Sequence, residues 1–188
     1  MKSLLLIIPL LFLTGCGVAG KYNPDYVSQS IEKNYKKVDS VSVGIIKNDE
    51  ILPRESDNVA LGKITLNLET GDINSNISKE FFSQYFSNVK LINPSEKADI
   101  IIKSKIDNYS YLFNKPSDGS TITLNYSIEV YKKDKLILKK TYTIKESNDV
   151  LITLVGVSSP LNGLKELIHK SLLGILENQV KPDILNSL

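Results

Sequence analysis

The sequence is poor in the residues that most often form cross-links or metal sites. Its 188 residues include one cysteine, one histidine, one methionine and no tryptophan. A single cysteine cannot form an internal disulfide, and one cysteine with one histidine cannot complete a structural zinc site. The 23 lysine and arginine residues are nearly balanced by 21 aspartate and glutamate residues. The chain therefore lacks the basic excess that is typical of nucleic-acid-binding proteins.

Enough apolar residues are nevertheless present for a folded domain. Hydrophobic residues make up 41% of the chain, and its length fits one domain with an appendage. No internal repeat or glycine-rich phosphate loop is found, because Gly15, Gly17 and Gly20 do not lie in a strand-to-helix turn. The composition predicts a small folded protein with few residues of the types that commonly carry out catalysis.

The N-terminal segment has the pattern of an export signal. Lys2 precedes an apolar run at residues 4–13, which is too short for a permanent membrane-spanning helix and typical of a signal peptide. The run ends at residues 13–16, Leu-Thr-Gly-Cys, which resembles the lipobox of bacterial lipoproteins. The only cysteine of the chain, Cys16, stands at the position that a lipobox requires.

The lipobox resemblance implies a lipid anchor. In that class the chain is cleaved before the cysteine, the thiol is joined to diacylglycerol, and the new amino terminus is acylated, with palmitate as the expected chain type. Several acyl chains on one residue hold a protein firmly on a membrane. Gly17 differs from the Asp that resembles an inner-membrane retention signal in enterobacteria, so we expect the outer membrane, facing the periplasm. An ordinary cleaved signal peptide and an uncleaved membrane helix are the alternatives.

Three segments are predicted: a signal peptide at residues 1–15, a lipidated tether at residues 16–40, and a single α+β domain at residues 41–188. In the tether, apolar residues at 27, 31, 35 and 38 fit either a short helix after Asn23-Pro24 or a solvated linker. The domain follows from alternating and helical patterns, which are considered next.

Alternation of apolar and polar residues predicts five strands. They lie at residues 41–45, 61–69, 98–113, 121–130 and 136–144. Residues 48–58 are predicted to be an exposed loop. Within residues 98–113, Ile100, Ile102 and Ile106 share one face, and Tyr109 and Tyr111 are predicted on the other. Turn signals at residues 117–120 and 132–135 join the last three strands into an antiparallel meander.

Two amphipathic helices are also predicted. The first has apolar residues at 77, 81, 82, 85, 86 and 89, with residues 74–76 (Asn-Ser-Asn) as caps. Its four aromatic residues are interpreted as a core face rather than a ligand-stacking site. The second helix begins at Ser159-Pro160, and Pro182 ends or kinks it. The fold class is therefore α+β, with a mainly antiparallel sheet of about five strands and both helices packed on one face.

Residues suited to catalysis are isolated in this sequence. His169 lies on the C-terminal helix without a nucleophile nearby and is predicted at its surface or boundary. A glycosidase needs two paired carboxylates, and the candidates considered are Asp99, Asp107, Asp118 and Glu129. Asp118 lies in a predicted turn, and the others alternate along strands, where charged residues normally mark the solvated face. We therefore expect no enzyme activity, no metal site and no cofactor beyond the covalent lipid.

One mature segment is unusually apolar for a connection between a strand and a helix. No charged residue occurs between Asp149 and Lys165. The large apolar residues of this segment are Val150, Leu151, Ile152, Leu154, Val155 and Val157. The segment is predicted to be either a core-facing extension or an exposed loop that docks a partner protein or the membrane.

Lysine pairs are spread along the chain at residues 36–37, 132–133 and 139–140. They fit either a solvated surface or contact with the phosphates of anionic lipid.

The order of these motifs resembles a known family. A lipobox is followed by a strand, an amphipathic helix, an Ala-Asp-Ile-Ile-Ile strand (98–102), a tyrosine-containing strand (121–130), a Lys-Lys-Thr-Tyr strand (139–142) and a long terminal helix. This layout is similar to the YajG family of envelope lipoproteins. It also resembles, more weakly, LptE and the auxiliary lipoproteins of lipid ABC transporters, although the usual LptE segment after the cysteine is absent. The resemblance implies a non-enzymatic envelope protein whose partner is an envelope protein or a lipid.

Overall fold

A computed structural model of the chain describes residues 18–20, 37–58, 62–113, 120–148 and 158–185. Cys16, the possible helix after Asn23 and the apolar segment at residues 150–157 lie outside the described residues. The elements are β1 (Val18–Gly20), β2 (Val38–Ile46), β3 (Leu52–Asn58), β4 (Gly62–Leu68), α1 (Thr70–Ser83), β5 (Phe86–Ile92), β6 (Ile100–Phe113), β7 (Ser120–Lys132), β8 (Lys135–Asn148), α2 (Ser158–Ile175), η2 (Leu176–Val180) and α3 (Lys181–Leu185).

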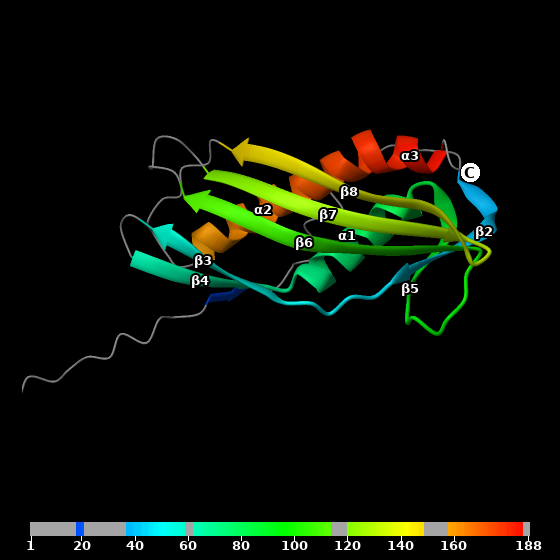
Figure 1. Cartoon of the computed structure of the whole chain (residues 1–188), viewed down its shortest axis with the longest axis horizontal. Helices are drawn as coiled ribbons and strands as arrows, with labels where there is room; N and C mark the ends of the chain where they lie inside the picture. The colour runs from blue at the N-terminus through cyan, green and yellow to red at the C-terminus, as the bar shows by residue number, and fades with distance from the viewer. Residues whose placement is uncertain (1–17, 21–36, 59–61, 114–119, 149–157, 186–188) are drawn as a thin grey trace, which may run out of the picture.

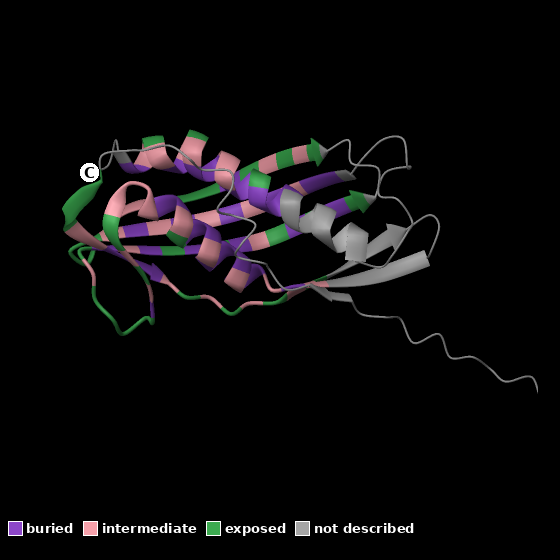
Figure 2. Cartoon of the chain, turned by 180° about the vertical axis from the view of Figure 1, so that it is seen from behind, coloured by how far each residue is buried: buried purple, intermediate pink, exposed green. Residues whose placement is uncertain are grey.

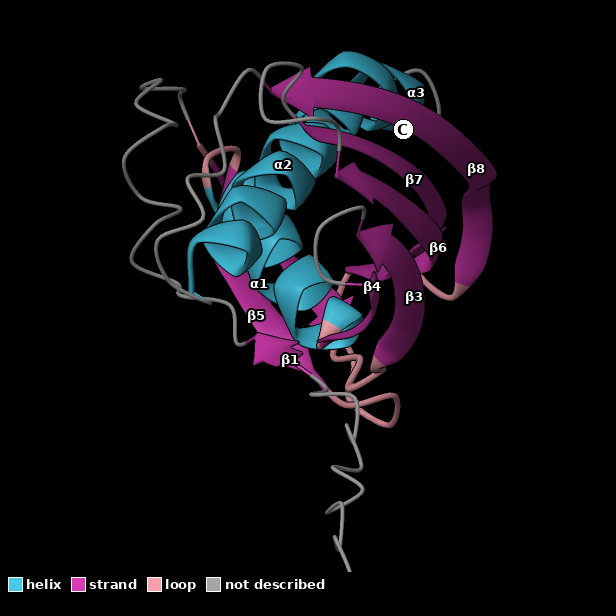
Figure 3. Cartoon of the chain, turned by 90° about the vertical axis from the view of Figure 1, so that its left-hand side faces the viewer, coloured by secondary structure: helices cyan, strands magenta, loops and turns pink. Residues whose placement is uncertain are grey.

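The fold is α+β, with a five-stranded sheet in the order β5-β2-β6-β7-β8 (Figure 1). Helices α1 and α2 lie on one face of this sheet, as predicted, and the sheet curves around them (Figure 3). The prediction of a mainly antiparallel sheet was wrong. Strand β2 pairs in parallel with both β5 and β6, and only β6, β7 and β8 form the antiparallel meander.

The connection from β2 to its parallel partner β5 passes through β3, β4 and α1. The predicted first helix ends at Ser83, and Phe86 begins β5 instead of continuing the helix. Val89 of β5 is paired with Val43 of β2 and packs against the core. The apolar spacing continued past the end of the helix because the apolar residues of β5 also face the core. The predicted helical assignment of Phe86 and Val89 was therefore incorrect.

Gly44 allows β5 and β6 to flank β2 in the same direction. The connection between them, residues 93–99, crosses over β2. A Cβ atom on Gly44 would lie 2.2 Å from Ile92 Cδ1 and 3.1 Å from Ala98 Cβ. Glycine inside a strand often marks such a close approach of another segment.

A second, three-stranded sheet has the order β1-β4-β3. Residues 52–58, predicted as a loop, form β3, which pairs antiparallel with β4 from Leu52–Leu68 to Asn58–Gly62. This edge strand is rich in charged and polar residues. It pairs through backbone hydrogen bonds, so its sequence lacks the apolar alternation by which a strand is predicted. Strand β1 lies within the predicted tether and pairs in parallel with β4.

A β-bulge corrects the predicted faces of β6. The pairing between β6 and β7 shifts register between Ile106 and Asn108. An extra residue in one strand reverses which face the following side chains occupy. Tyr109 and Tyr111 therefore point to the same buried face as Ile106, with 2% and 6% of their surface exposed. The prediction that they lie on the opposite face was wrong.

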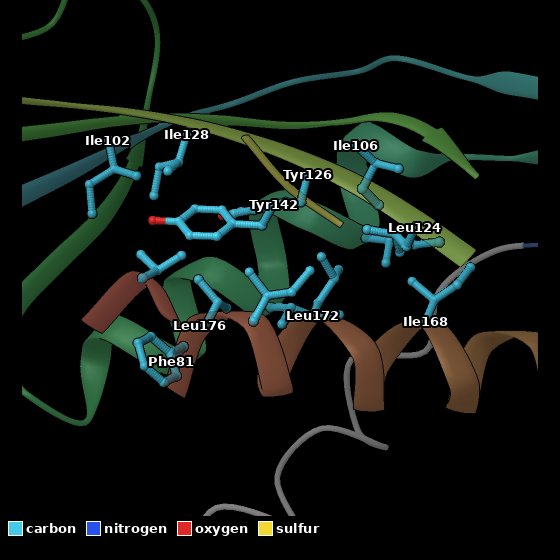
Figure 4. Packing of buried hydrophobic residues seen from close by; sticks show 14 of the residues in the cluster. Phe81, Ile102, Ile106, Leu124, Tyr126, Ile128, Tyr142, Ile168, Leu172 and Leu176 are labelled. Carbon is cyan, nitrogen blue, oxygen red and sulfur yellow. The ribbon is translucent and has the colours of Figure 1, made fainter. Parts of the chain in front are cut away.

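The core lies between the sheet and the two helices. The five alternating apolar residues of β7 are at most 1% exposed, which confirms the clearest predicted strand: Ile122, Leu124, Tyr126, Ile128 and Val130. Figure 4 shows side chains of the sheet facing Ile168, Leu172 and Leu176. Figure 2 shows the buried residues running along the helices and the strands behind them.

Helix α1 begins four residues before the predicted caps. Asn74 and Ser75 are buried inside the helix, where they bond to other elements. The Asn74 side-chain amide donates to the Ser104 carbonyl oxygen at 2.8 Å and to the Ser104 hydroxyl at 3.1 Å. The Asn48 amide donates to the Ser75 hydroxyl at 3.2 Å. These side chains fix α1 against β6 and against the segment after β2, rather than capping the helix.

The C-terminal helix changes its winding before Pro182. The α-helix α2 passes into the π-helical turn η2, where the Lys181 amide bonds to the Leu176 carbonyl oxygen, and then into α3. Proline cannot donate to the preceding turn, and its ring requires space there. The predicted kink is thus a local widening of the helix. Among the described helices, none combines the length and apolar character needed to cross a bilayer.

Two glycine-to-alanine substitutions are expected to change stability in opposite directions. A Cβ on Gly71 would lie 2.2 Å from the Asn48 carbonyl oxygen, a backbone atom. We expect Gly71→Ala to lower the free energy of unfolding by about 3 kcal/mol. Gly174 lies in a helix with ordinary contact distances, 3.5 Å to Ile144 Cδ1, so Gly174→Ala should raise it by about 1 kcal/mol. Urea unfolding of both variants checks this, and an unchanged Gly71→Ala midpoint would contradict the packing of α1.

Candidate functional site

A cavity of about 630 Å³ lies where the first residues of β2 meet the end of α1, α3 and the β7–β8 hairpin. Its apolar lining residues are Val38, Val41, Phe81, Phe82, Tyr85, Phe86, Ile100 and Ile184. Its polar lining residues are Ser40, Asp99, Lys132, Lys133 and Lys181. Ligand pockets commonly have this size and combine an apolar lining with a few polar groups.

The aromatic residues of α1 form one wall of the cavity. The Phe81 and Phe82 rings pack edge to face with centroids 5.2 Å apart, and the Phe81 and Tyr85 centroids are 5.3 Å apart. Phe81 and Phe82 are buried, so the prediction that they belong to the core is confirmed. They also line the cavity, which the sequence analysis did not foresee. Val38, at the mouth, is 43% exposed.

A polar cluster fixes the wall formed by Tyr85 and α3. The Tyr85 hydroxyl donates to Glu177 Oε2 at 2.8 Å, and Lys181 Nζ forms an ion pair with Glu177 Oε1 at 2.9 Å. The same ammonium lies 4.9 Å from the centroid of the Tyr85 ring. The hydrogen bond to Glu177 raises the pKa of Lys181, so this lysine is charged at neutral pH. The widened turn η2 carries Glu177 and thereby positions both side chains.

Helix α3 is attached to β8 through Asp183. Its carboxylate accepts hydrogen bonds from the Tyr142 hydroxyl at 2.6 Å and from Lys140 Nζ at 2.8 Å. The bond from Lys140, followed by that from Tyr142, lowers the pKa of Asp183. Because α3 also carries Ile184 and Lys181, this attachment holds one wall of the cavity in place.

Asp99 ties three elements together at the mouth. Its Oδ2 accepts from the Ser42 hydroxyl at 2.6 Å and from the Ser42 amide at 2.8 Å. Its backbone carbonyl accepts from the Lys133 amide at 3.1 Å. The hydrogen bonds from Ser42, and more weakly the charge of Lys133, lower the pKa of Asp99. Asp99 thus joins β2 and β6 to the β7–β8 hairpin, which is a structural role.

The β7–β8 hairpin places two lysines at the rim. Its central residues Lys133 and Asp134 have φ of 49° and 63°. Tight hairpin turns of this type need two residues of positive φ and favour Asn-Gly or Asp-Gly. Lys132 and Lys133 are both exposed. A lysine in the left-handed region is uncommon, so its presence at this rim is notable.

The residues considered for catalysis are not brought together. His169 is only 5% exposed, so the prediction of a surface or boundary position was wrong: it lies on the core side of α2. Asp99 is engaged with Ser42, and Asp107 accepts from Ser127 and pairs with Lys105. Asp118 lies outside the described residues.

Glu129, the remaining candidate carboxylate, accepts from Tyr131 and pairs with Lys139. Within the described part of the chain, no group of three or more His, Cys, Asp or Glu residues is arranged to hold a metal ion.

The open face of the sheet has a second, shallower hollow of about 350 Å³. It is lined mainly by polar residues of β6 and β7, including Lys103, Lys105 and Glu129. Lys105 pairs with Asp107, and Glu129 pairs with Lys139. These ion pairs form a solvated surface and leave the apolar cavity as the better candidate site.

The sequence matches no protein-family model and no curated protein. The structure is similar to that of protein XCC0632 from Xanthomonas campestris, a DUF330 protein, with 7% identity, a TM-score of 0.48 and coverage of 71% of this chain and 79% of that chain. It is similar to an uncharacterized protein with 6% identity, a TM-score of 0.44 and coverage of 73% and 89%. It is also similar to the hypothetical protein CT253 from Chlamydia trachomatis, with 13% identity, a TM-score of 0.38 and coverage of 73% and 94%. Similarities this distant assign no family and no function.

The attachment of α3 predicts an acid-sensitive contribution to stability. The lowered pKa of Asp183 means that its contribution is present above the ordinary value of 3.8 and is lost as pH falls through the lower folded value. We expect Asp183→Asn to lower the thermal unfolding midpoint at pH 7, because Tyr142 and Lys140 lose a charged acceptor. The difference from the unsubstituted chain should shrink as pH falls below 3.8.

The matched control is Asp49→Asn, because the pair of Asp49 with Lys47 is largely exposed, with 78% and 49% of the side-chain surface accessible. This variant should change the midpoint little. An Asp183→Asn effect equal to that of the control, or one unchanged down to pH 2, would contradict the proposed attachment.

Proposed function

We propose that this chain is a lipid-anchored protein of the bacterial envelope that binds the apolar part of a ligand in the cavity between α1, β2 and α3. The protein is non-enzymatic in this proposal. The lipobox at residues 13–16 provides the membrane anchor at Cys16, and the outer membrane, facing the periplasm, is the proposed location. The YajG-like order of motifs is consistent with such a binding or assembly role.

The cavity is the observation that carries this proposal. It encloses about 630 Å³ and is lined by eight apolar residues from α1, β2, β5, β6 and α3. Without an occupant, the apolar lining of this open cavity faces water, which costs free energy. Occupation by an apolar group would remove that cost. Anchoring also raises the local concentration of the domain at the membrane, so a modest affinity is sufficient.

A second candidate function is a role as an accessory in lipopolysaccharide or phospholipid transport. The lysines at the cavity rim favour it, since such lipids combine apolar chains with anionic headgroups. The two candidates share the cavity and differ in whether the bound molecule is handed on.

The anchor is tested by labelling with radioactive palmitate in a Gram-negative host. The unsubstituted chain should take up the label and sediment with outer membranes, whereas Cys16→Ser should take up none, because the acylated thiol is lost. Gly17→Asp is the matched control, which should keep the label and shift toward the inner membrane. Absence of label in the unsubstituted chain would refute the lipid anchor and leave an ordinary cleaved signal peptide or an uncleaved membrane helix.

The cavity is tested with an uncharged photoreactive long-chain alcohol. The full-length lipidated protein is placed in phosphatidylcholine vesicles, and labelled peptides are mapped by mass spectrometry. Val41→Phe should reduce labelling of cavity peptides about tenfold, because the added ring occupies the space of the ligand. Val89→Phe, on β5 and away from the lining, is the control. Labelling confined to surface peptides in the unsubstituted protein would refute the proposal.

A further inference from the structure

We infer that the cavity binds an anionic lipid through a single acyl chain, with the phosphate of the headgroup held at the rim by Lys132 and Lys133. This inference rests on the proposed function and adds the class of ligand and the residues that select it. It has three parts: the capacity of the cavity, the charge of its mouth and the geometry of the hairpin.

The capacity of the cavity fits one chain. A cavity of 150 Å³ in another protein is known to hold one benzene molecule, with six carbon atoms. On that scale a cavity of about 630 Å³ has room for on the order of 25 carbon atoms. This exceeds the needs of one acyl chain of ordinary membrane length and falls short of two. The aromatic wall of Phe81 and Phe82 provides an apolar surface along which such a chain would lie.

The charge of the mouth favours an anion. Three lysines line the cavity against one aspartate, Asp99, whose Oδ2 already accepts two hydrogen bonds from Ser42. Lys181 is paired with Glu177, and the hairpin adds Lys132 and Lys133 as two exposed cationic residues at the rim. Within the described residues, Lys133 forms no salt bridge, and its charge helps to lower the pKa of Asp99.

The hairpin geometry provides an independent reason to single out Lys133. Its φ of 49° lies in a region that lysine rarely adopts, at a turn position where glycine or asparagine is favoured. Asp99 accepts from the Lys133 amide and fixes the turn beside the cavity. The turn therefore holds a cationic side chain at the mouth of an apolar cavity, where an anionic group can meet it.

The structure also distinguishes the lysine pair at residues 132–133 from the pair at residues 139–140, which the sequence analysis treated alike. Lys139 pairs with Glu129 at 2.7 Å on the open face of the sheet, and Lys140 pairs with Asp183 at 2.8 Å. Neither lines the cavity. Lys140 also holds α3 through Asp183, so the matched control of equal charge change combines Lys139 with Lys105, which pairs with Asp107 on the open face.

The test compares two photoreactive lipids that share one acyl chain: lysophosphatidylglycerol, which is anionic, and lysophosphatidylcholine, which is zwitterionic. Each carries the photoreactive group near the end of its chain and is titrated into phosphatidylcholine vesicles that contain the full-length protein. The measured quantity is the apparent Kd for labelling of cavity peptides. The double variant Lys132→Gln with Lys133→Gln is compared with the double variant Lys105→Gln with Lys139→Gln.

We expect the apparent Kd of the anionic lipid to be about 30-fold lower than that of the zwitterionic lipid at low salt. This difference corresponds to a factor of roughly five for each of the two lysines. The rim variant should remove this preference, and the control variant should keep most of it. Added salt should reduce the preference in the unsubstituted protein. Glycerol 3-phosphate, which lacks a chain, should compete only weakly; strong competition would show a phosphate site without an acyl-chain site and overturn the inference.

The outcomes distinguish the inference from the proposed function. Equal labelling by both lipids, or an equal loss in the rim and control variants, would overturn the inference while leaving apolar binding intact. Absence of cavity labelling by either lipid, together with labelling by the uncharged alcohol, would limit the ligand to a neutral molecule and also overturn it. Failure of all three probes would refute the proposed function itself.

Discussion

The position of α1 depends on polar side chains that are buried in its first half. Thr70, Asn74, Ser75 and Ser78 are each only 1% exposed. Buried polar groups must find hydrogen-bond partners, and these partners occur at one placement of the helix. Thr70 reaches the Glu50 carbonyl oxygen at 3.2 Å, and Asn74 reaches Ser104. An apolar helix face would tolerate sliding along the sheet, whereas this one is held in a single register.

That register determines where the second half of α1 lies. Phe81 and Phe82 follow Ser78 by about one turn, Tyr85 comes just after the helix ends, and all three line the cavity. Here the first residues of β2, the hairpin and α3 approach without filling the space between them. The cavity is thus a consequence of one helix that is polar and fixed at one end and aromatic at the other.

The strands with strict alternation were predictable, and the parallel pairing was not. Five residues of β7 alternate without interruption, and all five are buried. In contrast, the parallel pairing of β6 with β2 depends on a connection that passes over Gly44, and the local signal for it is a glycine between two apolar residues. The faces of Tyr109 and Tyr111 depend on a bulge that pairing with β7 creates. Such long-range contacts leave little trace in the local sequence.

The candidate site was predictable in its parts and not as a whole. The aromatic stripe and the lysine pairs could both be recognised in the sequence. Their assembly could not, because Val41, Phe82, Lys133 and Ile184 come from four elements that meet only after folding. The sequence also did not show that Lys133 lies at the mouth of the cavity, whereas Lys139 forms an ion pair on the open face of the sheet.

The mixed sheet also has a consequence for the order in which the protein assembles. The meander of β6, β7 and β8 is closed by neighbouring hairpins, whereas β2 must pair with β5 and β6 across more distant stretches of chain. Local pairings form faster than distant ones, so the parallel half is expected to join a meander that already exists. The cavity lies at this seam. Amide exchange should therefore be fastest there, and a bound ligand would act as a clamp that slows local opening.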